Sequence, residues 1–174
     1  MSEWKEATLR EIATIIMGQS PAGETCNNEG HGVPLLNGPT EFGARHPIPT
    51  QFTVDPKKIA EADDLLFCVR GSTTGKMNWA DQKYAIGRGI ASIRSKDGVS
   101  FQPYIRAVIE NELNSLLSIA TGSTFPNISR DNLLSLSIQL PPTNTKIYIS
   151  NLASVLDTKI DNLRRQNETL EEIA

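Results

Sequence analysis

Residues 65–94 read LLFCVRGSTTGKMNWADQKYAIGRGIASIR, and this stretch decides the fold class. Four short runs rich in apolar and aromatic residues alternate in it with turns that contain Gly or Asp. Runs of this length between such turns are typical of β-strands, whereas a helix needs a longer periodic segment. The stretch therefore predicts strands at 65–69, 77–80, 84–86 and 90–94.

The sequence on both sides of this stretch adds further strands and several helices. Thr8 and Glu11 have the spacing of a capping box, which predicts a short helix that begins at Thr8. Residues 103–117 carry apolar side chains three and four positions apart, which is the pattern of an amphipathic helix. Ser129 is suited to cap another short helix. Further strands are predicted at 33–36, 51–54 and 136–140.

The composition changes after the two prolines at 141–142, because residues 145–174 contain no Gly or Pro and carry charges of alternating sign. Leu156, Leu163 and Leu170 lie seven positions apart there, which is typical of a coiled-coil helix. Such an apolar stripe needs a partner, either another helix or the chain's own globular part. The residues predicted to pack in this stripe are Ile149, Leu152, Leu156, Ile160, Leu163, Leu170 and Ile173.

The two prolines also predict a boundary between a globular part, residues 1–142, and a helical part, residues 143–174. The expected fold class is α+β, in which a mixed α/β globular domain is followed by a long C-terminal coiled-coil helix. The last four residues, EEIA, contain no helix stop signal, which favours a cut within a longer natural helix.

Length and composition are those of an ordinary globular protein. The chain has 174 residues, of which 39% are apolar and 21% charged, and its formal net charge is −3. No apolar run reaches the roughly 18 residues that a membrane span needs, and the charged N-terminus is unlike a signal peptide. Two cysteines do not make a disulfide framework, so we expect a cytoplasmic protein rather than a secreted or membrane protein.

Charge is unevenly distributed along the chain. Residues 70–106 contain seven Lys or Arg and two Asp, a local balance of +5 within an acidic protein. A local basic face can bind phosphates because salt screens charges that lie more than about 10 Å away. The loop at 70–76, RGSTTGK, adds the hydroxyls and backbone amides that commonly hold phosphates. The alternatives are a solvated sheet surface and a simple tight turn.

The motifs that resemble catalytic sites are all incomplete. Segment 71–76, GSTTGK, is one residue shorter than a phosphate-binding P-loop, and Met77 replaces the hydroxyl that binds the metal. Segment 140–143, LPPT, lacks both the polar and the aromatic residue of amino-methyltransferase motifs. A single D-x-K at 81–83 is too common to indicate a nuclease. We therefore expect no enzymatic activity of the chain's own and no cofactor.

A metal site is not expected either. The candidate ligands are Cys26, His31, His46 and Cys68. Their spacing is irregular, and Cys68 falls within a predicted strand, where a free cysteine behaves as a small core residue.

Several short motifs follow one another along the chain in a recognisable order. They are Trp4 with Leu9-Arg-Glu-Ile12, Gly18-Gln-Ser-Pro21, Val33-Pro-Leu35, Asp64-Leu-Leu-Phe67 with Arg70-Gly71, Ile86-Gly-Arg-Gly-Ile90, Thr121-Gly-Ser-Thr124 with Asn127-Ile128, and Ile138-Gln-Leu-Pro-Pro142. In this order and spacing, the chain resembles one half of the DNA-specificity subunit of type I restriction-modification systems. It departs from that family at 143–146, where TNTK replaces an apolar residue and Glu-Gln, and at 63–64, where Asp-Asp replaces Gly-Asp. A second recognition half is missing, so the chain is either a fragment or a naturally halved subunit.

The resemblance implies a target-recognition domain in residues 1–142 and a helical spacer in residues 143–174. It implies sequence-specific recognition of double-stranded DNA, which targets a type I methyltransferase and restriction complex to its site. The implied partners are methyltransferase (M) subunits, through them the restriction (R) subunit, and a second copy or second half of the specificity subunit. The alternative is a small coiled-coil interaction module whose globular head binds another protein.

The local charge balance and the hydroxyl-bearing, Gly-flanked loop predict where DNA binds, because the resemblance itself supplies no base contacts. We expect residues 70–89 to line the DNA face, because cations position a protein on phosphates and Arg reads base edges. Arg70 has an alternative role, an ion pair with Asp63 or Asp64, whereas Arg88 lies between two glycines that leave it room to enter a groove. The predicted DNA-binding residues are Arg70, Ser72, Thr73, Thr74, Lys76, Lys83 and Arg88.

Overall fold

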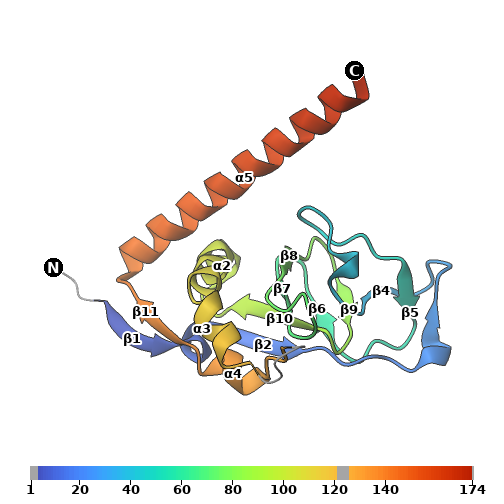
Figure 1. Ribbon diagram of the computed structural model, residues 1–174, viewed down its shortest axis with the longest axis horizontal. Coiled ribbons are helices and arrows are strands. Elements are labelled where there is room, and N and C mark those ends of the chain that lie inside the picture. Colours follow the sequence, from blue (N-terminus) through green and yellow to red (C-terminus); the bar gives the residue numbers. More distant parts are fainter. Residues whose placement is uncertain (1–3, 121–125, 174) are drawn as a thin grey trace.

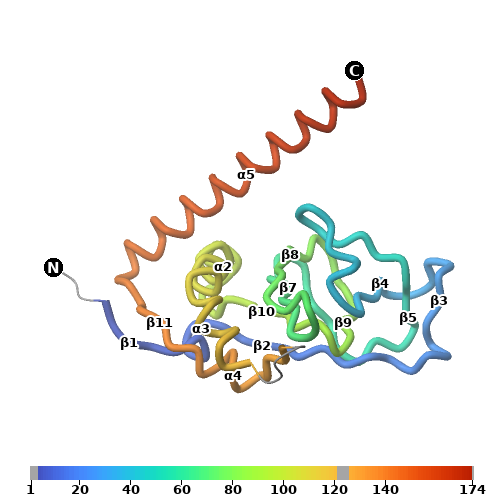
Figure 2. Tube along the Cα trace, viewed as in Figure 1, coloured from blue at the N-terminus to red at the C-terminus, as the bar shows by residue number. Residues whose placement is uncertain are grey.

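The computed structural model describes residues 4–120 and 126–173. Figure 1 shows a globular part of strands and short helices, with the long helix α5 running diagonally past it to the C-terminus. Figure 2 shows the same path as a trace. In chain order the elements are β1 (Lys5–Thr8), α1 (Leu9–Ile12), β2 (Ala13–Met17), β3 (Cys26–Asn27), β4 (Val33–Leu36), β5 (Gln51–Thr53), β6 (Ile59–Ala60), β7 (Leu65–Cys68), β8 (Met77–Trp79), β9 (Tyr84–Ile86), β10 (Ile90–Ser95), α2 (Gln102–Asn111), α3 (Leu113–Ser118), α4 (Arg130–Leu134), β11 (Ser137–Leu140) and α5 (Thr143–Ile173).

Two sheets form the body of the globular part. The first has the strand order β2-β10-β7-β8 and is antiparallel throughout. The second has the order β3-β5-β4-β9-β6, in which only the pair β4 and β9 is parallel. A separate antiparallel pair joins β1 to β11, so the beginning of the described chain lies beside the residues that precede α5.

Strand β7 shows why the stretch that begins at residue 65 organises the fold. Leu65 and Phe67 belong to one core cluster, whereas Leu66 belongs to a second cluster on the other side. Successive side chains of a strand point to opposite faces, so β7 is buried on both. A strand buried on both faces is apolar along its whole length, which is why this run is continuous rather than alternating.

The helices α2, α3 and α4 cover the first core cluster with apolar side chains that include Ile105, Ile109 and Leu116. The prediction of one helix at 103–117 is wrong in one respect, because the chain forms two helices with a break at Glu112. The backbone of Glu112 leaves the helical region (φ −96°, ψ 8°), and both Ile109 before the break and Leu116 after it are fully buried.

The capping box predicted at the start of α1 is present, because the Thr8 amide donates to Glu11 Oε1 at 2.7 Å. The helix is only one turn long, since Ala13 is already extended and pairs with Ser95 as β2 joins β10. The local sequence pattern does not show β2, because its pairing partner lies far along the chain.

Helix α5 begins directly after the two prolines and reaches Ile173. Ser150 is buried, and its hydroxyl donates to the Ser100 carbonyl oxygen at 2.6 Å. The helix therefore lies partly against its own globular part, through a stripe whose members are three or four residues apart. That stripe includes Lys146, Ile149, Ser150, Ala153, Asp157 and Asp161. None of the helices in the described ranges is long and apolar enough to span a membrane.

Candidate nucleic-acid interface

Several loops that are distant in the sequence meet at one edge of the two sheets. The backbone bonds that join them run from the Gly18 amide to the Ile90 carbonyl (2.9 Å), from Gln19 to Ile86 (2.8 Å), from Val69 to Gly89 (2.9 Å), and from Gly87 to Leu36 (2.8 Å). We call this surface the loop edge. It consists of residues 18–20, 37–38, 70–76, 87–89 and 126–127.

Close backbone packing explains the glycines of the loop edge. A Cβ atom on Gly18 would lie 2.1 Å from the Gly87 carbonyl oxygen, and one on Gly89 would lie 2.6 Å from the Asn37 carbonyl oxygen. Contacts this short are sterically forbidden, so these positions require glycine. The glycines on either side of Arg88 therefore bring loops together, while the Arg88 side chain itself is exposed.

Arg70 follows the buried strand β7 and is exposed at the loop edge. Its Nε donates to Asn127 Oδ1 at 3.1 Å, and the two residues form a backbone bridge between their segments. Asp64 pairs with Arg94, and among the described residues neither Asp63 nor Asp64 forms an ion pair with Arg70. Arg70 therefore joins the 70–76 loop to the 126–127 segment and is exposed at the loop edge.

The three hydroxyls of the loop at 70–76 have different environments. Thr74 Oγ1 lies 2.7 Å from the Gly71 carbonyl oxygen and 2.9 Å from the Pro126 carbonyl oxygen, so this hydroxyl fastens the loop to the neighbouring segment. Thr73 Oγ1 lies 3.6 Å from Cys68 Sγ and is half-buried. Ser72 is exposed, which makes it the hydroxyl of the three that is best placed for an external partner.

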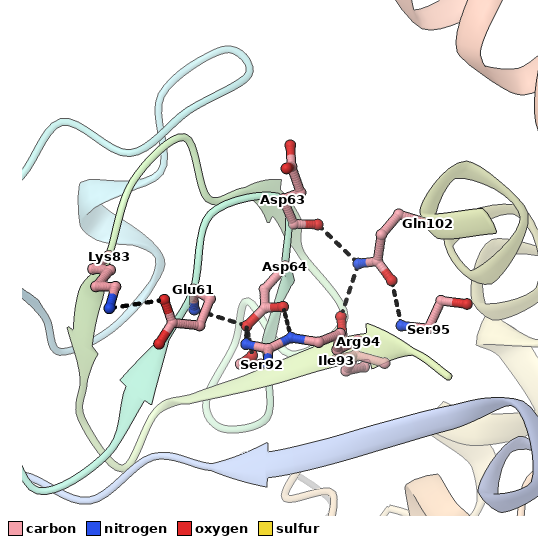
Figure 3. Close-up of polar contacts among 9 residues, drawn as sticks. All are labelled: Glu61, Asp63, Asp64, Lys83, Ser92, Ile93, Arg94, Ser95 and Gln102. Atoms are coloured by element: carbon pink, nitrogen blue, oxygen red, sulfur yellow. Dashed lines mark hydrogen bonds and ion pairs between the residues drawn. The ribbon is translucent and has the colours of Figure 1, made fainter. Parts of the chain in front are cut away.

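The two predicted lysines lie at different ends of the first sheet. Lys76 is exposed in the turn that leads from β7 into β8. Because β8 runs antiparallel to β7, the chain returns along β8 to the opposite end before it reaches Lys83. There Lys83 Nζ lies 3.3 Å from Glu61 Oε2, as Figure 3 shows. Lys83 is therefore outside the loop edge.

A buried carboxylate holds the start of β7 in place. Asp64 is 1% exposed and accepts hydrogen bonds from Arg94 Nε (2.6 Å) and Nη2 (2.8 Å), the Ser92 hydroxyl (2.5 Å) and the Glu61 amide (2.9 Å) (Figure 3). The hydrogen bond to Asp64 raises the pKa of Arg94 above its ordinary value. Arg94 thus serves the fold, although it contributes to the local positive balance of the sequence.

Gln102 forms a second buried polar contact beside this group. Its Nε2 donates to the carbonyl oxygens of Asp63 (2.9 Å) and Ile93 (3.0 Å), and its Oε1 accepts a hydrogen bond from the Ser95 amide. Figure 3 shows how Gln102 connects the beginning of α2 to both strand ends. These contacts fix the end of the sheet that lies opposite the loop edge.

Most residues of the apolar stripe predicted on α5 do not pack against the globular part. Leu152, Leu156, Leu163 and Leu170 are between 45% and 65% exposed, and Ile160 and Ile173 are also exposed. Ile149 differs, because it is half-buried and packs against the first core cluster. The face of α5 that contacts the globular part is therefore different from the face that carries the leucines.

Four polar residues of the loop edge are absent from the site predicted from the sequence. Gln19, Ser20, Asn37 and Asn127 lie there because the pairing of distant strands brings their loops together. The motif Gly18-Gln-Ser-Pro21 was the available signal for Gln19 and Ser20, and the motif Asn127-Ile128 was the available signal for Asn127. The motif Thr121-Gly-Ser-Thr124 lies outside the described residues. Within the described ranges, no group of three or more His, Cys, Asp or Glu side chains could hold a metal ion.

Comparisons with known proteins point to one family. The putative type I restriction enzyme MjaX specificity subunit of Methanocaldococcus jannaschii is 37% identical over 97% of this chain. The type I restriction enzyme MjaIX specificity subunit of the same organism is 34% identical over 99% of it. The chain spans 40% and 42% of the lengths of these two relatives.

A solved structure and a family model agree with these relatives. The crystal structure of the HsdS subunit from Thermoanaerobacter tengcongensis superimposes with a TM-score of 0.73 and 31% identity, over 94% of this chain and 40% of that one. The family model described as the type I restriction modification DNA specificity domain matches residues 1–172. The match runs through the globular part and along nearly all of α5, and the chain therefore belongs to the type I restriction modification DNA specificity family.

Proposed function

We propose that the chain recognises a specific double-stranded DNA sequence and thereby directs a type I methyltransferase and restriction complex to its site. Membership of the DNA specificity family over residues 1–172 is the observation that carries this proposal. The loop edge supports it, because Arg70, Lys76 and Arg88 are exposed there. In the described part of the chain, no acidic side chain forms an ion pair with any of these three cations.

Different groups of the loop edge suit different parts of DNA. Lys76 and Ser72 are suited to phosphates, to which a point charge and a hydroxyl bind without reading sequence. Arg88 and Arg70 carry planar guanidinium groups, which can donate two hydrogen bonds to one guanine edge. The glycine contacts hold these loops in fixed positions, so the cations are presented by a rigid edge.

The two parts of the chain have different roles in this proposal. Residues 1–142 form the target-recognition domain, and residues 143–174 form a spacer that packs against a second copy or second half through the exposed leucine stripe. The M subunits bind to this assembly in the cytoplasm and bring the R subunit with them. The M and R subunits supply the chemistry, and the specificity chain supplies none. Family membership does not favour the alternative of a protein-binding interaction module.

Mapping DNA methylation tests the proposal directly. The chain is expressed together with a type I methyltransferase subunit, and modified bases across the host genome are located by sequencing. We expect one methylated sequence motif that is present only when this chain is expressed. The same methylation pattern in cells without the chain would contradict the proposal, as would methyl transfer to DNA by the purified chain alone.

A further inference from the structure

The contact between α5 and the globular part changes character along the helix. Near the beginning of α5, Ile149 packs against the first core cluster and Ser150 is buried. After Ser150, no residue of α5 within the described ranges is buried. The direction of the helix beyond this point therefore depends on contacts other than a shared apolar core.

Two ion pairs supply most of those contacts, together with a hydrogen bond from Arg164 Nη1 to the Ala44 carbonyl oxygen (3.1 Å). Arg106 of α2 places its Nη1 atom 3.4 Å from Asp157 Oδ2, and Arg45 forms an ion pair with Asp161 one turn further along α5. We call these four residues the clasp. Their side chains are at most 34% exposed, so these pairs are less screened by solvent than pairs on an open surface.

Both arginines of the clasp are anchored on Trp79, the last residue of β8. The Trp79 amide donates to the Arg45 carbonyl oxygen at 3.0 Å, and His46 Nδ1 lies 3.0 Å from the Trp79 carbonyl oxygen. The Arg106 guanidinium lies 5.7 Å from the centre of the Trp79 ring, which is within the range of a cation–π contact. The loop at 43–46 and helix α2 thus hold the two arginines against the same strand.

Strand β8 connects the clasp to the loop edge. It begins at Met77, directly after the loop at 70–76, and it pairs with β7, from which that loop departs. The hairpin that carries Arg70 and Lys76 at one end therefore carries the anchor of the clasp at the other. A fixed clasp means a fixed direction of α5 relative to the candidate DNA contacts.

We propose that Arg45 and Arg106 are positioning residues, which hold α5 in one direction from the loop edge and thereby determine the separation and relative orientation of two recognition domains joined through α5. The proposal rests on the proposed function, since this separation matters only if the domains bind DNA. Helix α5 has 31 residues and is about 46 Å long at 1.5 Å per residue. A small change of angle at the clasp therefore becomes a large displacement of whatever binds the far end.

A distance measurement within one chain tests the clasp without DNA. Spin labels are placed at Lys58→Cys on the globular part and Asn167→Cys on α5, in a chain that also carries Cys26→Ser and keeps the buried Cys68. The labelled chain is diluted with unlabelled protein, so that pulsed electron paramagnetic resonance reports distances within one molecule. We expect one narrow distance peak for the parent chain, and loss of that peak in the double variant Asp157→Asn with Asp161→Asn.

A matched control removes the same charge elsewhere on α5. Glu168→Gln with Glu172→Gln lies on exposed positions of the same helix and should keep the narrow peak. Asp161→Arg should lose the peak, and adding Arg45→Asp should restore it, because the reversed charges can pair again. A broad distribution in the parent, or a narrow peak in the Asp157 and Asp161 double variant, would overturn the proposal.

A second readout separates positioning from a purely structural role. DNA duplexes with two copies of the recognised half-site at different separations are bound by the parent and by the Asp157 and Asp161 double variant. The double variant should lose the preference for one separation but keep its affinity for a single half-site and its unfolding temperature. A double variant that also loses affinity for a single half-site and has a lower unfolding temperature than the parent would contradict a positioning role. A parent that binds no DNA would refute the proposed function. The distance measurement would still show whether the clasp holds α5 in one direction.

Discussion

Two residues of the predicted DNA face, Lys83 and Arg88, lie at opposite ends of strand β9. Lys83 precedes β9 and Arg88 follows it, so the two exposed cations lie five positions apart along the chain, a separation of at most about 16 Å if fully extended. Lys83 lies beside Glu61, whereas Arg88 lies at the loop edge. A run of positive charge in the sequence therefore does not by itself define one face of the molecule.

This separation gives a direct comparison between two cations. Arg88→Ala should weaken binding to the recognised DNA by about 1–3 kcal/mol and relax specificity at one base pair, because a guanidinium that reads a base is lost. Lys83→Ala should leave affinity within about 0.5 kcal/mol of the parent, as is usual for surface substitutions away from a site. Fluorescence anisotropy with labelled duplexes measures both. An affinity loss for Lys83→Ala and none for Arg88→Ala would reverse the assignment.

The buried carboxylate of Asp64 predicts a change in stability rather than in DNA contacts. Asp64→Asn removes the charge that accepts from Arg94 and Ser92, and hydrogen bonds to charged groups contribute about 1.5–3 kcal/mol. We expect a loss of that order in the free energy of unfolding, measured by urea denaturation. Asp63→Asn is the control, because the Asp63 carbonyl rather than its carboxylate binds Gln102. Equal stability of both variants would show that the carboxylate contributes nothing.

Among the helices and strands, the sequence predicts those whose formation depends on neighbouring residues. The apolar runs of β7 and β9 and the cap of α4 are visible because each depends on neighbouring residues, and Ser129 Oγ accepts from the Asn132 amide as a cap should. Strand β2 is not visible, since its pairing with β10 is a long-range contact. The break at Glu112 is not visible either, because the apolar spacing continues across it and Ile109 and Leu116 are both buried.

The leucine stripe of α5 carries a prediction about association. Leu156 is 54% and Leu163 is 45% exposed in the single chain, so replacing both with Ala should change the unfolding free energy of the dilute monomer little. The same double variant should weaken self-association, because these side chains are buried only when another helix covers them. Analytical ultracentrifugation over a range of concentrations measures the difference. A parent and a variant that are both monomeric at every concentration would refute pairing of one copy with another through this stripe.

At the scale of the whole molecule, the candidate site arises from topology. Residues 18–20, 70–76 and 87–89 are far apart in the sequence, and they meet only because β2, β7 and β10 lie side by side in one sheet. The sequence supplied Arg70, Lys76 and Arg88 as candidates but could not show that Lys83 lies at the other end. It also left open whether α5 folds back, and the structure shows that the helix contacts its own globular part through Ser150 while the leucines stay exposed.

Selection from a random DNA library tests whether the loop edge reads a DNA sequence. The purified chain is incubated with random duplexes at moderate salt, and the retained duplexes are sequenced. The parent chain should enrich one motif. A triple variant, Arg70→Ala, Lys76→Ala and Arg88→Ala, should lose that enrichment while keeping the unfolding temperature of the parent. Enrichment of the same motif by the triple variant, or no enrichment by the parent, would contradict sequence recognition by the loop edge.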